Sequence, residues 1–498
     1  MEIDNEESKI KHEFYKGVSS IIGASIINLV YPSIFALNTF IVYQTSYIKN
    51  NGGNVNINHT MFYYPVVLFF QSIFGLIAGV IYSRIEVHWS NFLGTFLLLL
   101  ASFILYISKL FFLDMLSMAI YGIGIAIIMF PATTNACKYF KNHIGLVNGI
   151  VETFISLGST IFAYLGERII NPEEEKSRES DNLYEPNIAD RFKIFVLVQI
   201  GCFIVTFILC LFLIKKYKEK NLNQNEKEQL LPSTMSKNNI NINTNINANN
   251  ELKTKNYHNR KIKLKKVLKS WEFWRYNIIS LSQSPISDMV FAMYRGIGES
   301  KDIDQTILQL IGTLNFIIEF ILSFVYGVLC DYVNFKILLF SMNIIGTIVG
   351  FTYCLTFNSS FFFTLATLSI SVQSAAYYSL KDYHLMKVFG TEIYVDLSGF
   401  VTFFTGIVVL ILTFITYYVE ESLANNDTGY WIMFSVFGAI NGLGVILGFF
   451  EEDNPFDYGE NSETKIEQDN SNKENLNQEL INQEILNKNN QDNIIIKE

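Results

Sequence analysis

Apolar residues fall into twelve long blocks, six on each side of a polar stretch at residues 215–270. Each block approaches the roughly 20 apolar residues that a helix needs to cross a bilayer. The polar stretch is rich in Asn and carries fourteen Lys or Arg against four Glu, so it has too little apolar surface to fold alone. The pattern predicts an all-helical membrane protein with twelve transmembrane helices in two six-helix halves, joined by a basic linker.

The predicted helices of the first half span residues 17–43, 61–83, 91–108, 114–137, 145–169 and 192–214. Those of the second half span residues 273–294, 306–330, 336–357, 361–380, 393–419 and 430–450. The domains expected from this pattern are an N-terminal segment (1–16), the N-terminal half (17–214), the linker (215–270), the C-terminal half (271–450) and an acidic, Asn-rich, disordered tail (451–498).

Lys and Arg residues in the short loops predict the orientation in the membrane. With a cytoplasmic N-terminus, nine of them lie on the inner side and four on the outer side, leaving aside the acidic loop at residues 171–191. The three candidate glycosylation sequences then all lie in outer loops, at Asn58, Asn358 and Asn426. We expect both termini and the linker to be cytoplasmic, in either the plasma membrane or an internal organelle membrane.

Composition and motifs narrow the class of function. All five cysteines lie inside or at the ends of predicted helices, without the close-spaced pairs of metal sites. All six histidines fall in predicted loops, tails or the linker, which argues against a buried histidine relay. No predicted helix carries a Gly-rich phosphate loop or a nucleophile with its base. We therefore expect a non-enzymatic, monomeric protein without metal or cofactor, whose partners are membrane lipids and a small solute rather than nucleic acid.

A loop motif follows the second predicted helix of each half. The second-half copy contains Gly327, Asp331 and Lys336, whereas the first-half copy keeps Gly79 and Arg84 but has serine in place of the acid. The motif resembles the Gly-x-x-x-Asp loop of the major facilitator superfamily, whose Asp is thought to hold the N-terminus of a neighbouring helix and to close the cytoplasmic side. The resemblance implies a secondary transporter working by alternating access, with its solute site between the halves.

Several segments resemble one branch of that superfamily, the oxalate/formate antiporters and monocarboxylate transporters. They are Pro131 and residues 138–140, 145–149, 157–159, 171–172, 271–274 and 294–298. The branch implies transport of a monocarboxylate or dicarboxylate, often coupled to protons or counter-anions. Its members commonly carry an arginine for the substrate carboxylate four residues before the motif glycine, where this chain has Ser323.

Three hypotheses about function remain open. The first is a transporter of a monocarboxylate or dicarboxylate, as the branch implies. The second is a transporter of a cationic or zwitterionic solute such as an amino acid, because the predicted membrane interior offers acids and almost no bases. The third is a non-transporting membrane receptor or scaffold that keeps the fold.

Four acids fall inside predicted helices, namely Glu152, Asp288, Glu319 and Asp396. A charge at mid-bilayer costs roughly 2.5 to 3.5 kcal/mol, so each acid needs a reason to be there. Glu319 is nearest the centre of its helix, and Asn315 and Ser323 lie one turn away on the same face. We expect this face to line the solute cavity, with Glu319 as a proton or cation site. The alternative is a protonated glutamic acid bonded to a neighbouring helix.

The other candidates have weaker signals. We favour a structural role for Asp288, expect Glu152 to reach cytoplasmic water and expect Asp396 to cap its helix. Arg295 is the best remaining anion-attracting residue, although its position at the outer helix end also suits an ordinary interfacial arginine. Three neutral residues could donate hydrogen bonds to a solute: Asn28, Tyr31 and Gln283.

Overall fold

The computed structural model describes residues 2–55, 57–60, 62–173, 175, 178, 183–217, 259–423, 428–451 and 454–458. The chain divides into two compact units, Met1–Asn454 and Pro455–Glu498, and the second is described only at residues 455–458. Expectations about Asn426, about most of the linker and about most of the tail therefore lie outside the described residues.

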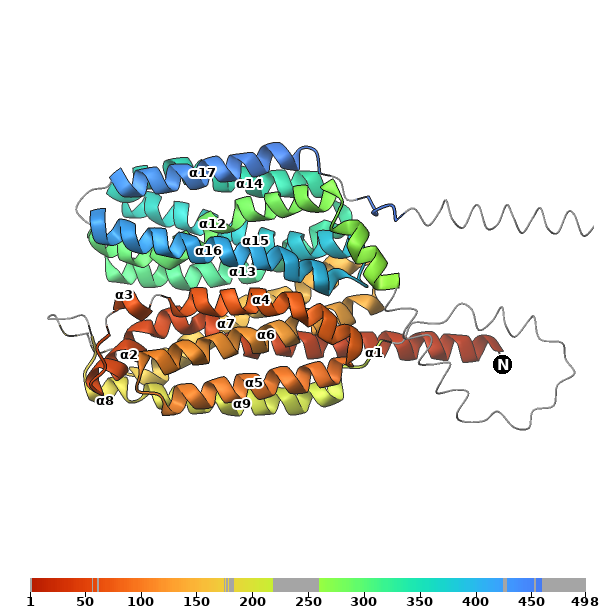
Figure 1. Cartoon of the computed structure of the whole chain (residues 1–498), viewed down its shortest axis with the longest axis horizontal. Helices are drawn as coiled ribbons and strands as arrows, with labels where there is room; N and C mark the ends of the chain where they lie inside the picture. The colour runs from red at the N-terminus through yellow and green to blue at the C-terminus, as the bar shows by residue number, and fades with distance from the viewer. Residues whose placement is uncertain are drawn as a thin grey trace, which may run out of the picture. The chain divides into compact units, whose positions relative to one another are not determined.

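The described part of the first unit is helical and contains no strand. The long helices of the first half are α1 (Glu2–Val30), α4 (Tyr63–Arg84), α5 (Val87–Ile107), α6 (Phe111–Tyr139), α7 (Ile144–Ile170) and α9 (Phe192–Leu213). Those of the second half are α12 (Trp271–Ser300), α13 (Gln305–Tyr332), α14 (Phe335–Thr352), α15 (Ser360–Phe389), α16 (Tyr394–Leu423) and α17 (Thr428–Gly448). Figure 1 shows each set lying side by side. The shorter elements are η1 (Tyr31–Ala36), α2 (Leu37–Asn50), α3 (Ile57–Thr60), α8 (Pro186–Ala189) and η2 (Tyr353–Asn358).

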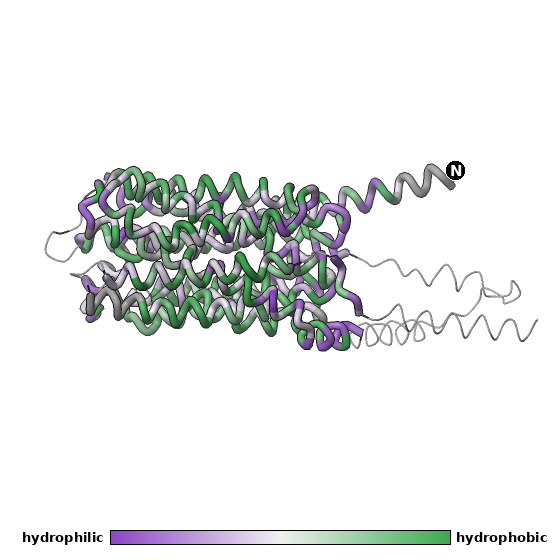
Figure 2. The backbone as a smooth tube through the Cα atoms, turned by 90° about the horizontal axis from the view of Figure 1, so that it is seen from above, coloured by the Kyte–Doolittle hydropathy of each residue, from purple (hydrophilic) through white to green (hydrophobic). Residues whose placement is uncertain are grey.

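Hydropathy agrees with a membrane environment. Within the described ranges, ten helices are long and apolar enough to cross a membrane. The two remaining long helices, α12 and α15, are 30 residues each but more polar, since they carry the buried charged residues described below. Figure 2 shows hydrophobic residues along the bundle and hydrophilic ones gathered towards its two ends. The predicted fold class, an all-helical membrane protein with two six-helix halves, is confirmed.

The first predicted membrane helix is interrupted at a proline. α1 ends at Val30, η1 contains Pro32, and α2 continues the chain to Asn50. Proline has no N–H to donate and frees a carbonyl group one turn earlier, which membrane helices accommodate by local 3₁₀ geometry. The first predicted helix therefore changes its backbone geometry at Pro32.

The two halves meet mainly through two helix pairs, α4 with α16 and α7 with α13. We call the end of the bundle where residues 259–270 lie the linker end. There Gly327 packs so closely on Gly149 that a Cβ at either position would overlap the other backbone. A Cβ at Gly79 would likewise overlap Asp396. Glycine at these positions lets the halves touch at the linker end.

Asp331 strengthens the contact between α13 and α7. Its carboxylate accepts hydrogen bonds from the backbone N–H groups of Gly145 (3.0 Å) and Leu146 (2.8 Å), in the first turn of α7. The first N–H groups of a helix have no partner within the helix and attract negative charge. Asp331 thus ties the end of one half to the beginning of a helix in the other half.

The corresponding contact between α4 and α16 uses a different chemistry. Composition predicts that the linker does not fold alone, but its residues 259–267 form a helix. Arg260 of this linker helix donates to the Asp396 carboxylate at 2.6 and 3.1 Å and to the Gly79 carbonyl at 2.8 Å. Asp396 lies in the first turn of α16, so its charge also suits the helix N-terminus. Arg260 therefore joins the linker to both halves.

One expectation about histidine was wrong. α15 continues to Phe389 instead of ending at residue 380, so His384 lies inside the helix and is fully buried. Its ring stacks between Tyr276 and Phe335, with centroid distances of 4.1 and 4.5 Å. The polar residues 381–384 interrupt the apolar pattern of the block, which is why hydropathy predicts a loop there.

Glu451, just after α17, connects His384 to α12. Its Oε1 lies 3.2 Å from His384 Nε2, and its Oε2 accepts a 2.7 Å hydrogen bond from Arg275 Nε. Burial favours a higher pKa for the Glu451 carboxyl, but the hydrogen bonds and charges of His384 and Arg275 outweigh it and hold the pKa below its ordinary value of 4.5. A carboxyl with a lowered pKa stabilises the fold above that ordinary value, and the contribution disappears as pH falls through the folded value.

Glu451→Gln should therefore destabilise the protein, because it leaves Arg275 and His384 without their anion. We expect a loss of about 3 kcal/mol, typical of a broken buried pair, measured as a lower Tm in detergent at pH 7. Glu272→Gln, at an exposed position on α12, is the matched control and should leave Tm unchanged. The Tm difference between wild type and Glu451→Gln should shrink below pH 4.5; a difference independent of pH would refute the ion-pair explanation.

Asp331→Asn and Arg260→Gln should each weaken closure at the linker end. Asp331→Asn removes an anion from the N-terminus of α7, a loss of roughly 0.3 to 1 kcal/mol, which corresponds to a two- to fivefold shift between closed and open forms. Arg260→Gln leaves the Asp396 carboxylate without its guanidinium partner and should shift the balance in the same direction. The measurement is maleimide labelling, from the linker side, of Ser156→Cys in a background without native cysteines. Ser83→Ala and Lys261→Gln are the controls and should label at the wild-type rate. Equal rates for all four variants would show that these contacts do not hold the halves.

Candidate functional site

Two acids lie deep in the second half, near the middle of long helices. Glu319 is close to the midpoint of α13, and Asp288 is close to the midpoint of α12. Both helices face the first half or neighbour those that do, because α13 packs on α7 and α12 packs beside α16. The sequence therefore places two partly buried carboxyl groups between the ends of the bundle.

Each acid has a hydroxyl group as a hydrogen-bond partner. Ser156 of α7 donates to Glu319 Oε2 at 3.4 Å, so this contact crosses between the halves. Ser284, one turn before Asp288, donates to its Oδ2 at 2.5 Å. A serine can donate to an ionised carboxylate or accept from a protonated one, so these partners fit either protonation state.

Two tyrosines complete the group. Tyr64 of α4 and Tyr378 of α15 each lie within electrostatic range of both Asp288 and Glu319. We call Asp288, Glu319, Tyr64, Tyr378 and Ser156 the central acidic site. It draws residues from five helices and from both halves, which is the position expected of a solute site in a protein built from two repeats.

The central acidic site carries negative charge without a matching base. In the described residues no Lys, Arg or His forms an ion pair with Asp288 or Glu319, and the charged neighbour that acts on Glu319 is Asp288. An unpaired carboxylate in a low-dielectric interior attracts a proton or a cation. The site is thus suited to binding positive charge.

The polar face predicted on α13 is used partly for packing. Asn315 Oδ1 accepts a 2.6 Å hydrogen bond from Ser371 of α15, and the Ser323 carbonyl accepts one of 3.0 Å from Ser379. Gly327 packs on α7, and Lys336 lies in the first turn of α14, whose N-cap is Asn334. Of this face, Glu319 is the residue that belongs to the central acidic site.

Other predicted site residues join helices within one half. Asn28 donates to the Val151 carbonyl at 3.1 Å, and the Tyr31 hydroxyl is 2.8 Å from that of Thr95. Gln283 is buried one turn from the central acidic site, and its side-chain N–H group has no hydrogen-bond partner among the described residues. Gln283 thus remains a candidate for binding solute.

The predicted loop residues take several positions. Arg295 is exposed in the last two turns of α12, far from the linker end. Arg84 ends α4, but its side chain is outside the described part. Asn358 is exposed at the end of η2, and Asn58 lies in α3. Figure 1 shows α3 at the end of the bundle opposite the linker end.

Two charged residues of α15 were missed from the sequence. Lys381 and Asp382 were assigned to an inner loop, but both are buried, and they lie within electrostatic range of Glu152. The sequence signal that could have placed both residues in the helix is Gly390, which has a φ of 89° and ends α15. Helices often end at a glycine in this left-handed conformation. Gly390 is the first glycine after residue 380, so the helix could have been extended to it.

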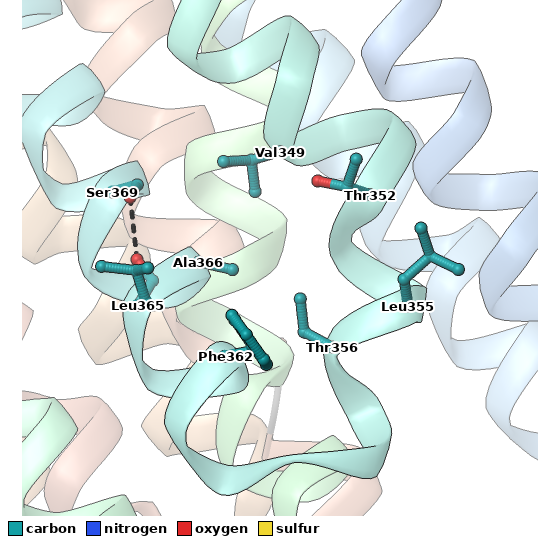
Figure 3. A pocket seen from close by; sticks show the side chains of 8 residues that line it. All are labelled: Val349, Thr352, Leu355, Thr356, Phe362, Leu365, Ala366 and Ser369. Carbon is teal, nitrogen blue, oxygen red and sulfur yellow. Dashed lines mark hydrogen bonds between the residues drawn. The ribbon is translucent and has the colours of Figure 1, made fainter.

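A pocket of about 370 Å³ lies elsewhere, between α14, η2 and α15. Figure 3 shows its lining, which includes Leu355, Phe362 and Leu365 but no charged side chain. These three residues are more than half exposed on the bundle surface, where lipid tails would lie. The pocket shares no residue with the central acidic site, so we do not assign it to the solute.

Comparisons with known proteins agree with the fold. The proton:xylose symporter XylE has a TM-score of 0.63 at 12% identity, with 89% of this chain and 98% of that chain covered. The fucose:proton symporter FucP of E. coli has a TM-score of 0.58 at 12% identity, covering 86% of this chain and 98% of its own. The human organic anion transporter MFSD10 gives 0.61 at 10% identity, covering 88% and 99%. At such identities the likeness shows the fold alone.

No curated protein sequence matches the chain. The family model described as Major Facilitator Superfamily matches residues 17–294, which is more than half of the sequence. The match covers the first half from residue 17 on, the linker and most of α12. With its helical bundle and two halves, the chain belongs to the Major Facilitator Superfamily of membrane transporters.

Proposed function

We propose that this protein is a secondary active transporter that moves a small cationic or zwitterionic solute through the central acidic site by alternating access. The observation that carries the proposal is the pair Asp288 and Glu319, partly buried near mid-helix without a described basic partner. A solute with an ammonium or guanidinium group would supply the missing positive charge. The same pair would repel an anion whenever either carboxyl is ionised.

Coupling to protons follows from the same chemistry. A proton and a cationic group compete for Glu319, because each neutralises the carboxylate. Alternating access exposes the site first to one side of the membrane and then to the other. Because the proton and the solute exclude one another at this site, the protein exchanges one for the other across the membrane. We therefore propose exchange of the solute for protons, with the linker end on the cytoplasmic side as the loop charges predict.

The hydroxyl groups around the acids support recognition of a polar solute. Tyr64, Tyr378 and Ser156 can each donate or accept a hydrogen bond. A cationic group can also rest on the face of a tyrosine ring, which adds about 0.5 to 2 kcal/mol depending on desolvation. The carboxylate of a zwitterion would accept hydrogen bonds from these hydroxyl groups and from the side-chain N–H group of Gln283, which has no partner among the described residues.

A monocarboxylate or dicarboxylate is the second candidate, and Lys381 is the observation that favours it. This lysine is buried between the halves and could attract a carboxylate. However, its ammonium is 3.6 Å from Asp382 and within range of Glu152, so its charge is already balanced by two acids. A cationic or zwitterionic solute therefore fits the interior better.

Replacing Glu319 by Gln distinguishes the two candidates. Gln copies the neutral carboxyl, so uptake of a labelled cationic solute into proteoliposomes should fall at least tenfold, about 1.4 kcal/mol of lost binding, and should no longer depend on pH. Uptake of an anion would persist, with a flattened pH profile. Glu167→Gln, on an exposed part of α7, is the control and should behave as wild type. Wild-type rate and pH profile in Glu319→Gln would make Glu319 a structural residue and overturn the proposal.

A further inference from the structure

A second group of buried charges lies between the halves, one helical turn from the central acidic site towards the linker end. Glu152 belongs to α7 of the first half, and Lys381 and Asp382 are neighbours in α15 of the second. The side chains of Lys381 and Asp382 are both 5% exposed, with Nζ 3.6 Å from Oδ1. Glu152 was expected to reach cytoplasmic water, but it is buried at 8% exposed and interacts electrostatically with both. We call these three residues the linker-end triad.

The elements around Glu152 supply few other ionisable groups. α6 contributes Cys137, and α16 contributes Tyr394. α15 contributes Tyr377, beside Lys381. α13 brings Asp331, which binds the first turn of α7 and acts on Cys137, and α12 brings Tyr276, which acts on Asp382. α1 also packs on α7, but none of its described ionisable groups acts on Glu152. The charges that matter are therefore those of the triad itself.

The triad has an excess of negative charge when all three groups are ionised. Two carboxylates face one ammonium group, and α7 is held against α15 by the bond from Asn148 Nδ2 to the Ser379 carbonyl. Closing the halves removes water from this group. An uncompensated carboxylate is costly to bury, whereas a neutral group is not.

Unpartnered polar atoms around the triad point in the same direction. In the described residues, two buried side-chain oxygens within one turn of Glu152 on α7, those of Asn148 and Thr153, have no hydrogen bond. Buried polar groups in proteins are nearly always bonded, so exceptions mark places where a proton, a water or an ion is bound. A protonated carboxyl supplies a new O–H donor, which the carboxylate oxygen of Asp382 can accept.

We propose that the linker-end triad binds one proton on closing, with Glu152 as its acceptor, and releases it when the halves separate at the linker end. The proton comes from water on the linker side and returns to it, so its binding sets the balance between closed and open forms without crossing the membrane. Acidity on that side therefore favours the closed form. Alkalinity favours the form open to the linker side.

The inference adds regulation to the proposed transport cycle and rests on that function only for its biological meaning. It is tested without solute. If Glu319→Gln behaves as wild type while the triad responds to pH, the transport proposal fails and this one stands. If the wild-type open fraction does not change with pH while Glu319→Gln loses uptake of the cation, the triad proposal fails and the transport proposal stands.

The experiment measures the distance between spin labels at Lys141→Cys and Tyr332→Cys, two exposed linker-end positions on opposite halves, in nanodiscs from pH 5 to pH 9. Uptake or release of one proton changes the open-to-closed ratio by at most about tenfold per pH unit. We expect the open fraction of the wild type to rise with pH. Glu152→Gln should stay closed at every pH, because Gln copies the protonated form.

Two further variants keep the test decisive. Asp382→Asn leaves one carboxylate and one ammonium and should also be closed and insensitive to pH, which covers the case in which Glu152→Gln does not fold. Lys381→Met leaves two carboxylates, so closing needs two protons and the ratio should change by up to about a hundredfold per pH unit. Glu167→Gln, the same change at an exposed site on α7, should keep the wild-type profile. A wild-type profile in Glu152→Gln or Asp382→Asn would overturn the proposal.

Discussion

The cost of placing a charge inside the hydrocarbon layer, roughly 2.5 to 3.5 kcal/mol at mid-bilayer, organises the interior of this protein. Compensation of buried charge decreases from the linker end towards the centre. At the linker end Asp331 receives two backbone N–H groups and Asp396 receives a guanidinium. One step deeper, one lysine is shared by two acids. At the centre, Asp288 and Glu319 have hydroxyl groups alone.

This gradient assigns different roles to chemically similar residues. A fully compensated acid such as Asp331 holds the halves together, because each of its oxygens is used in the closed form. An acid without a counter-charge, such as Glu319, is the one for which we propose binding of a proton or a cationic solute. The need to compensate buried charge also accounts for the difference between the two contacts at the linker end. The first half lacks the motif acid, and the structure provides Asp396 and Arg260 at the matching contact between α4 and α16.

The sequence predicted most of the fold because membrane helices leave a strong hydropathy signal. Twelve apolar blocks, the break at Pro32 and the central position of Glu319 could all be read from residue order. The site was harder, because the polar residues that build it weaken that signal. α15 was ended too early at residue 380, and Lys381, Asp382 and His384 were taken for loop residues. Electrostatic interactions between distant helices, such as that of Tyr64 with Asp288, leave no trace in a single sequence.

The most direct measurement of the central claim is uptake of a labelled panel by proteoliposomes containing the purified protein, with lysine, lactate, oxalate and glucose compared under an imposed pH gradient. The account predicts that lysine accumulates when the vesicle interior is acidic, because protons leave as the cation enters, and that lactate and oxalate do not. Uptake of lactate or oxalate without lysine, driven by an acidic exterior, would contradict it.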